Sequence, residues 1–441
     1  MSTTICALST PYGRGGIAVI RVSGDKAIEI TSKIFKSKKP LEQAASHTVT
    51  FGRIIDGETT VDQALVTVFR GPNSFTGEDV CELSCHGGMV VVNKITDLLI
   101  ENGCEMAQPG EFTKRAFLNG KLSLTEAEAV KDVIDARTDG ALWAAVNRLE
   151  GGITEPICEL REKLLRLLAA IQVASDFPEE DVEDFSGGDL LGELEGIYSE
   201  LLRLKNSARR GEALREGITC AICGIPNTGK SSLLNALYER EKAIVTDLAG
   251  TTRDVVEVWI DVEGIPVKLG DTAGIRESGD KVEKIGVEMS LDYIRQADIC
   301  LFVTEAGRDL NPEEEEILSS IKCPIIKIAN KIDVNNEIQN DYFGTSAKEN
   351  IGIDKVKKEI VSVLGLMSTG GSVVANRRQL QAVVRAMEAV SRAKNSVENG
   401  FFSDLAAIDV REAVEALGEA EGMSVNQETV NKIFEEFCLG K

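Results

Sequence analysis

The chain has 441 residues, with 49 basic and 71 acidic side chains, so its formal net charge is −22. At about 100–200 residues per domain, this length predicts several domains. A hydrophobic fraction of 43% beside a charged fraction of 27% excludes a wholly disordered chain. No apolar run reaches the ~18 residues typical of a membrane-spanning helix, and the first residues lack the pattern of a secretory signal. Ten cysteines without a repeating spacing indicate reduced thiols, so we expect a cytoplasmic protein.

The acidity is concentrated in the middle of the chain. Residues 1–120 have a net charge of −1, residues 121–370 one of −18, and residues 371–441 one of −3. Because phosphate binding needs cationic side chains, this distribution argues against a broad nucleic-acid-binding surface on this chain alone.

The first part of the chain predicts an α+β domain over residues 1–119. Apolar runs at 17–22 and 64–69, bounded by glycine and proline, are typical of buried strands. Residues 89–101 follow a pair of glycines and have a helical pattern.

Helical periodicity begins near residue 122 and returns at 379–394, 405–417 and 427–438. A different pattern lies between these two helical parts. Between 218 and 366, strand-like and helix-like segments alternate, which favours a mostly parallel, doubly wound α/β sheet. Residues 367–372 (MSTGGS) are typical of a linker. We therefore expect an α/β domain over 216–371, inserted into a discontinuous helical domain made of 120–215 and 372–441.

The strongest chemical signal is a phosphate-binding loop. Residues 224–231 (GIPNTGKS) match GxxxxGK[ST] and lie between a predicted strand and a predicted helix. Glycines let main-chain N–H groups surround phosphate oxygens, while Lys230 reaches the β- and γ-phosphates and Ser231 reaches Mg²⁺. The strand–loop–helix context predicts a nucleotide site in a Ras-like P-loop domain.

Two later motifs identify the base as guanine. Asn330, Lys331 and Asp333 follow an apolar strand, and a carboxylate there accepts hydrogen bonds from guanine N1–H and its exocyclic amine. Adenine offers no matching pair of donors. The stretch 345–348 (TSAK) fits a loop that closes over the base.

Two further segments fit the switches of a GTPase. Thr251 and Thr252 lie in DLAGTTRD and offer a hydroxyl to Mg²⁺, and residues 271–274 (DTAG) fit the segment that senses the γ-phosphate. Ile275 stands where many GTPases carry a water-orienting glutamine, which leaves Arg253, Arg276 and Glu283 as candidates or as mere surface residues. The GTP contacts predicted from all motifs are Asn227, Thr228, Gly229, Lys230, Ser231, Ser232, Thr246, Asp247, Leu248, Ala249, Gly250, Thr251, Thr252, Asp271, Thr272, Ala273, Gly274, Asn330, Lys331, Asp333, Ser346, Ala347 and Lys348.

The cysteines favour a structural interpretation with one exception. Cys220 and Cys223 lie inside the strand before the phosphate loop, so a core position is favoured over zinc or redox chemistry. Cys438 lies near the end of the chain, where burial on a helix competes with an accessible thiol activated by neighbouring cations.

Four further stretches are distinctive: TPYGRGGIAVIRVSG (10–24), GPNSFTGEDVCELSCHGG (71–88), PGEFTKRAFLNGKLSLTEAEAVKDVIDA (109–136) and FCLGK (437–441). In these stretches and in the GTPase motifs, the chain resembles the MnmE/TrmE family of tRNA uridine-modification GTPases. The GTPase motifs are shared with many relatives, whereas the N-terminal stretches and the terminal CLGK are far more specific.

The resemblance implies a dimerising N-terminal domain that binds a tetrahydrofolate derivative, 5-formyl- or 5,10-methylene-tetrahydrofolate, through Arg21, Glu82, Lys121 and Lys441. It implies a homodimer that works with the FAD- and NADH-dependent partner MnmG (GidA). The pair adds a carboxymethylaminomethyl or aminomethyl group at C5 of the wobble uridine of certain tRNAs. We expect weak tRNA contact by the acidic chain itself, with a basic partner supplying most of the phosphate-binding surface.

The resemblance also implies K⁺-stimulated hydrolysis, with K⁺ held by Asn227, Thr246, Leu248 and Thr251 and Mg²⁺ held by Ser231 and Thr252. It assigns orientation of the attacking water to Glu283, which fills the gap left by Ile275. The predicted catalytic residues are thus Lys230, Glu283 and Cys438, the last with an unspecified role in modification.

Two other functions remain open at this stage. One is a regulatory GTPase of ribosome assembly without modification chemistry, which predicts a basic RNA-binding tail; the last 71 residues have a net charge of −3. The other is a folate-dependent aminomethyltransferase in which the GTPase domain acts only as a regulator.

Overall fold

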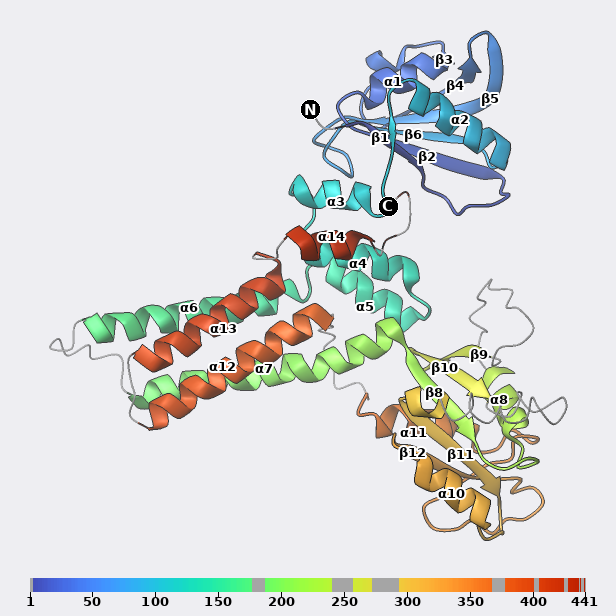
Figure 1. Ribbon diagram of the computed structural model, residues 1–441, viewed down its shortest axis with the longest axis vertical. Helices are drawn as coiled ribbons and strands as arrows, with labels where there is room; N and C mark the ends of the chain where they lie inside the picture. The colour runs from blue at the N-terminus through green and yellow to red at the C-terminus, as the bar shows by residue number, and fades with distance from the viewer. Residues whose placement is uncertain are drawn as a thin grey trace. The chain divides into compact units, whose positions relative to one another are not determined.

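The computed structural model describes residues 3–176, 187–239, 257–271, 293–366, 377–399, 404–423, 427–435, 437 and 440 (Figure 1). The chain divides into two compact units, one made of residues 1–131 with 421–441 and the other of residues 132–420. Among the described helices, none combines the length and the apolar composition that crossing a bilayer requires.

The first unit is built on a seven-stranded sheet with the strand order β3-β4-β5-β6-β2-β1-β7. Its strands are β1 (Ile5–Leu8), β2 (Ile17–Ser23), β3 (Phe35–Ser37), β4 (Thr48–Asp56), β5 (Thr59–Phe69), β6 (Val80–His86) and β7 (Glu105–Met106). All neighbours pair antiparallel except β1 and β7, which are parallel. The strands predicted at 17–22 and 64–69 are confirmed, although β5 begins earlier, at Thr59.

Helices α1 (Ala27–Ile34) and α2 (Met89–Glu101) cover one face of this sheet. Their apolar residues share one buried cluster with alternate strand residues such as Ile20, Val66 and Leu83. Alternate side chains of a strand point to opposite faces, so one face of each strand enters this core and the other faces outward. The helix predicted at 89–101 is confirmed with the same bounds.

Helices α3 (Glu111–Leu118) and α14 (Gln427–Glu435) bring the end of the chain back to its first unit. Phe434 and Phe437 are buried with Leu124 at the start of α4 (Leu124–Asp135). Gly110 has φ +68, and a Cβ there meets the carbonyl of Phe434, so only glycine fits this close approach. The described helix α14 ends at Glu435, earlier than the predicted limit of 438.

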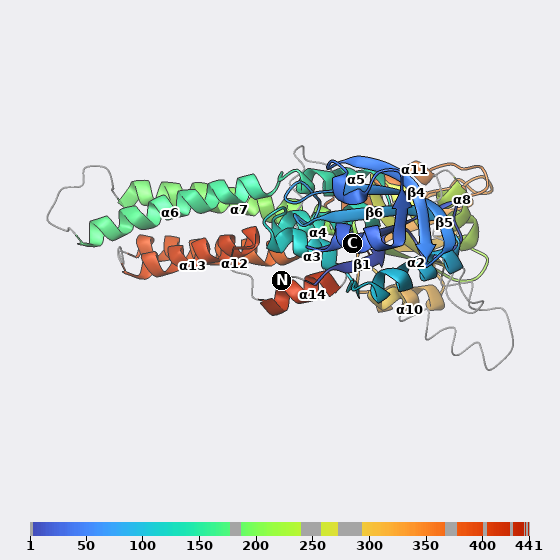
Figure 2. The ribbon, with the colours of Figure 1, turned by 90° about the horizontal axis from the view of Figure 1, so that it is seen from above.

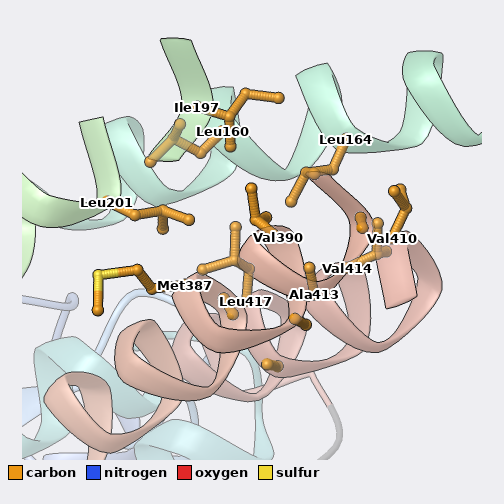
Figure 3. Packing of buried hydrophobic residues seen from close by; sticks show 14 of the residues in the cluster. Leu160, Leu164, Ile197, Leu201, Met387, Val390, Val410, Ala413, Val414 and Leu417 are labelled. Atoms are coloured by element: carbon orange, nitrogen blue, oxygen red, sulfur yellow. The ribbon is translucent and has the colours of Figure 1, made fainter. Parts of the chain in front are cut away.

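The second unit contains a bundle of long helices from distant parts of the sequence. These are α6 (Thr154–Asp176), α7 (Gly187–Glu216), α12 (Arg377–Glu398) and α13 (Asp404–Glu421); the shorter α5 (Asp139–Leu149) contacts α7 and buries Ala144 in the core of the α/β sheet instead. Figures 1 and 2 show α7 running alongside α12. Their apolar faces interlock in one core, in which Leu164, Leu201, Val390 and Leu417 are fully buried (Figure 3). The helices predicted at 379–394 and 405–417 are confirmed and are longer at both ends.

The same unit contains a six-stranded sheet with the order β13-β12-β11-β8-β10-β9. Its elements are β8 (Ile218–Cys223), α8 (Lys230–Glu239), β9 (Glu257–Val262), β10 (Ile265–Asp271), β11 (Ile299–Glu305), α10 (Pro312–Ser320), β12 (Ile325–Asn330), β13 (Phe343–Gly344) and α11 (Ile353–Val363). All pairs are parallel except β9 with β10. The predicted mostly parallel α/β sheet is therefore confirmed, and the loops that follow β8, β11 and β12 meet at one edge, where ligands bind in such sheets.

Candidate nucleotide-binding site

The phosphate loop connects β8 to α8 along a path that demands unusual backbone angles. Gly224 has φ +138 and Gly229 has φ +90, and a Cβ at either position meets Val303 or Asn330. Asn227 also lies in the left-handed region, with φ +66, which is uncommon for a residue with a side chain. The loop delivers the chain into the first turn of α8, whose free N–H groups attract anions.

Lys230 stands at the first position of α8 and is 5% exposed. Its Nζ donates to the carbonyl of Ile225 at 2.7 Å, and the hydroxyl of Thr228 donates to the same oxygen at 3.0 Å. The ammonium group of Lys230 therefore lies over the phosphate loop that precedes it. In this position it can neutralise phosphate charge, as the sequence predicts. Ser231 follows it in α8.

Asn330 ends β12, and its side chain connects the phosphate loop to the loop at 345–348, which is called the base loop below. Its side chain is 2% exposed, and its Nδ2 donates to the carbonyl of Thr228 at 2.9 Å. Its Oδ1 accepts from the main-chain N–H of Ala347 at 3.1 Å and from the hydroxyl of Thr345 at 3.2 Å. The amide thus connects three segments far apart in sequence.

Asp333 lies on the exposed side of this junction. Its Oδ1 accepts a hydrogen bond of 2.5 Å from the Ser346 hydroxyl, which is the largest cause of a lowered pKa, and the charges of Lys348 and Lys331 act in the same direction. The carboxylate is therefore fully ionised near neutral pH. An ionised, exposed carboxylate can accept hydrogen bonds only, which suits the two donors on the guanine edge.

The structure brings together only part of the predicted site. Asn227, Thr228, Gly229, Lys230, Ser231 and Ser232 lie on one side, and Asn330, Lys331, Asp333, Ser346, Ala347 and Lys348 lie on the other. Asp271 ends β10, in register with Ile222 of β8, so its backbone lies at the same edge of the sheet. The predicted contacts at 246–252, at 272–274 and at Glu283 lie outside the described residues, as do Arg253 and Arg276.

A second polar group lies in the first unit, on the sheet face opposite α1 and α2. Arg21 on β2 and Glu82 on β6 are register partners, and Nε and Nη2 of Arg21 donate to Oε1 of Glu82 at 3.0 and 2.8 Å. The rings of Phe75 and Phe112 lie 5.4 and 5.6 Å from the guanidinium. Cation–π attraction to both rings adds to the ion pair and fixes the arginine.

Of the other two residues predicted to bind folate, the structure describes Lys121 but not Lys441. Lys121 lies beside Gly77, because a Cβ on that glycine would stand 3.4 Å from Cγ of Lys121. Lys441 and Cys438 lie outside the described residues, but the neighbouring Gly440 accepts a hydrogen bond of 3.0 Å from the hydroxyl of Ser9. Ser9 follows β1, which pairs with β2, so the end of the chain reaches the strand next to Arg21.

The paired cysteines are core residues, as the sequence favours. Cys220 and Cys223 are buried in β8, and burial raises the pKa of Cys220. Burial likewise raises the pKa of Cys81 to about 12 and that of Cys85 to about 11. Such thiols are protonated at neutral pH and are poor nucleophiles.

Comparison with known proteins identifies the family. Residues 4–121 match the family described as "GTP-binding protein TrmE N-terminus", and residues 124–438 match the "MnmE helical domain". The chain is 42% identical to the tRNA modification GTPase MnmE of Bacillus mycoides over 99% of both chains. It is also 42% identical to that of Carboxydothermus hydrogenoformans over 100% of both. The chain belongs to the MnmE/TrmE family.

As a member of the MnmE/TrmE family, the chain is a GTP-binding GTPase that acts in tRNA modification. Solved structures also align with part of it. A point variant of Aquifex aeolicus Era bound to GDP·AlF₄⁻ is 25% identical, with a TM-score of 0.27, and the match covers 39% of this chain and 66% of the Era chain. The G domain of the Thermotoga maritima FeoB transporter is 27% identical, with a TM-score of 0.26, and the match covers 33% of this chain and 98% of that domain. The family assignment depends on the full-length relatives and not on these structures.

Three residues near the two sites were not singled out from the MnmE/TrmE motifs. Glu305 forms an ion pair with Lys331, and Phe75 and Phe112 flank Arg21. Glu305 is the last residue of the apolar strand β11, and in a parallel sheet the carboxyl end of a strand lies at the ligand edge, so this signal was present in the sequence. The two phenylalanines gave no comparable signal, because their proximity to Arg21 depends on tertiary folding.

We predict that Asp333→Asn changes the base specificity of the protein. The amide donates where guanine also donates, whereas xanthine presents a carbonyl at that position. GTP affinity should fall by about 100-fold or more, and affinity for xanthosine triphosphate should rise. Equilibrium titration with both nucleotides measures the change. Asp341→Asn is the matched control, because Asp341 is exposed between β12 and β13 with φ +75, which asparagine tolerates. Equal losses for both nucleotides would contradict the assignment.

Proposed function

We propose that the chain, acting in the cytoplasm with the flavin-dependent partner MnmG (GidA), modifies the wobble uridine of certain tRNAs. The product carries a carboxymethylaminomethyl or aminomethyl group at C5 of the base. The observation that carries the proposal is the full-length similarity to proteins named tRNA modification GTPase MnmE, 42% identical over 99–100% of each chain. Similarity over the N-terminal and helical parts, and not only over the GTPase motifs, supports a shared reaction.

A tetrahydrofolate derivative is the proposed one-carbon carrier, held by Arg21, Glu82, Lys121 and Lys441. Supporting this, Nε and Nη2 of Arg21 donate to Glu82 and the side chain is 16% exposed, while within the described part of the chain its other N–H groups have no recorded acceptor and suit a carboxylate or a ring carbonyl. Glu82, 28% exposed, has acceptor capacity left for pterin N–H donors. The folate supplies the one-carbon unit, while this chain's residues bind and orient it.

For GTP hydrolysis we propose that Ser231 and Thr252 hold Mg²⁺, with Lys230 on the β- and γ-phosphates and Glu283 orienting water. Asn227, Thr246, Leu248 and Thr251 would hold K⁺. Asn227 supports this, because its main-chain carbonyl accepts from Lys331 while no described residue bonds its exposed side chain, whose oxygen is thus available. The cations supply positive charge where negative charge develops between the phosphates.

Homodimerisation through the N-terminal domain is also proposed. The outward face of the first-unit sheet exposes Val49, Phe51 and Leu65 by 59%, 64% and 45%, and Phe51 and Leu65 are register partners on neighbouring strands. Contiguous exposed apolar side chains favour contact with another protein surface. A second copy is the proposed occupant.

We further propose the three-part division into an N-terminal domain (1–119), a discontinuous helical domain (120–215 and 372–441) and an inserted G domain (216–371). The shared core of α6, α7, α12 and α13 supports the discontinuous helical domain, because these helices come from both sides of the inserted α/β sheet.

Nucleoside mass spectrometry of tRNA tests the proposed function directly. A strain lacking this chain should lose the C5 modification of the wobble uridine, and the wild-type chain should restore it. Cys438→Ser should fail to restore the modification while sparing GTP hydrolysis, because a thiol needed for chemistry has no role in phosphate binding. Cys158→Ser, a half-buried thiol on α6, serves as control and should restore the modification. An unchanged wobble uridine in the deletion strain, as expected for a ribosome-assembly GTPase, would contradict the proposal.

The proposed K⁺ site predicts faster GTP hydrolysis in K⁺ than in Na⁺ at equal ionic strength. The two ions have the same charge, so a difference reports coordination by a site of defined size. We expect a ratio of about 10- to 100-fold, which Asn227→Ala should abolish. Asn336→Ala, an exposed residue with no recorded hydrogen bond in the described part of the chain, should leave the ratio intact. Initial rates of phosphate release in the two salts measure this ratio. Equal rates would contradict the proposed K⁺ site.

A further inference from the structure

The ammonium group of Lys331 lies between two fixed partners. Its Nζ donates to the main-chain carbonyl of Asn227 at 2.7 Å and forms an ion pair with the carboxylate of Glu305. Glu305 ends β11, and its register partner Asn330 ends β12. The ion pair therefore spans the carboxyl ends of two adjacent parallel strands, and the bond to Asn227 extends the connection to the phosphate loop.

Lys331 needs such partners to hold a single position. A lysine side chain has a flexible four-carbon stem and loses rotamer entropy when it is fixed. Here the side chain is 40% exposed, so water competes for the ammonium group. Asn227 in turn has φ +66, a left-handed backbone conformation that asparagine tolerates but that is still strained, so contacts from its neighbours help to hold it. A hydrogen bond from a freely moving lysine stabilises the backbone conformation of Asn227 only weakly. The ion pair with Glu305 anchors the lysine and so strengthens this stabilisation.

We propose that Glu305 is a positioning residue for nucleotide binding. Its carboxylate holds Lys331 so that the ammonium stays on the carbonyl of Asn227 and the stem stays beside the base pocket. Glu305 acts through Lys331 and does not touch the nucleotide. The inference rests on the proposed GTPase function and on the sequence-based prediction that Lys331 belongs to the base site, and it adds a residue that none of the GTPase motifs contains.

The expected effect is modest, because Glu305 is 38% exposed and the ion pair is screened by solvent. Exposed ion pairs of this kind change an equilibrium by up to about fivefold. A second ion pair nearby, between Lys348 and Glu349, is longer, at 3.9 Å, and more exposed. Glu349→Gln is therefore a matched control that removes a nearby carboxylate without affecting Lys331.

A double-mutant cycle on the full-length chain tests the proposal, with a fluorescent GDP analogue as probe. Glu305→Gln should weaken binding by about fivefold and speed dissociation, and the difference from wild type should shrink at high salt. In the Lys331→Met background, Glu305→Gln should cause no further loss, because the group it positions is gone. Glu349→Gln should bind as wild type does. Glu305→Asp, which keeps the charge but has a shorter reach, should lie between Glu305→Gln and wild type.

Each other outcome identifies which assignment fails. Wild-type affinity for Glu305→Gln, with weakened binding for Lys331→Met, overturns the positioning role and leaves the base site standing. The same fold-loss from Glu305→Gln in both backgrounds shows that Glu305 acts independently of Lys331 and also overturns the role. Wild-type affinity for Lys331→Met overturns the base-site assignment itself. Thermal unfolding of each variant separates these results from loss of folding, and Glu305→Asp carries the test if Glu305→Gln does not fold.

Discussion

The buried amide of Asn330 lies where three segments of the α/β domain meet, and the rest of the nucleotide site depends on it. It donates to the phosphate loop at Thr228 and accepts from Ala347 and Thr345 in the base loop. A side chain that is 2% exposed has no water to replace a lost partner. Leaving a buried donor or acceptor unpaired costs about 1–3 kcal/mol. The amide thus keeps the phosphate and base subsites at a fixed separation, and Lys331 repeats the connection closer to the surface.

The distribution of charge fits this organisation. The net charge of −22 lies mainly between residues 121 and 370, whereas residues 1–120 are close to neutral at −1. Two cations of the α/β domain have local contacts: Lys230 bonds to the phosphate loop, and Lys331 lies between Glu305 and Asn227. This charge distribution supports the proposed division of labour, in which this chain hydrolyses GTP and contacts tRNA over a small area while the proposed partner provides the broader phosphate-binding surface.

Much of this could be predicted from the sequence because the signals are local. The phosphate loop needs glycines at fixed positions, and the parallel sheet gives an alternation of strand-like and helical segments. The Glu305–Lys331 pair could not be predicted in the same way, because it depends on which strands become neighbours. The strand order places β11 beside β12, and only their register aligns Glu305 with Asn330. The end of α14 was predicted too late for a similar reason, since Phe437 packs in the core beyond the last helical turn and extends the apolar pattern.

The central claim is that the phosphate loop and the base loop, connected by the side chain of Asn330, form the GTP site. The affinity of the Asn330→Ala variant for GDP tests this claim most directly. Removing the amide leaves the carbonyl of Thr228 and the N–H of Ala347 without their partner and lets the two loops move apart. Calorimetric titration of the folded variant, beside Asn336→Ala as control, should show a loss of about 100-fold, equivalent to roughly three hydrogen bonds of ~1 kcal/mol each. Wild-type affinity in folded Asn330→Ala would contradict the account.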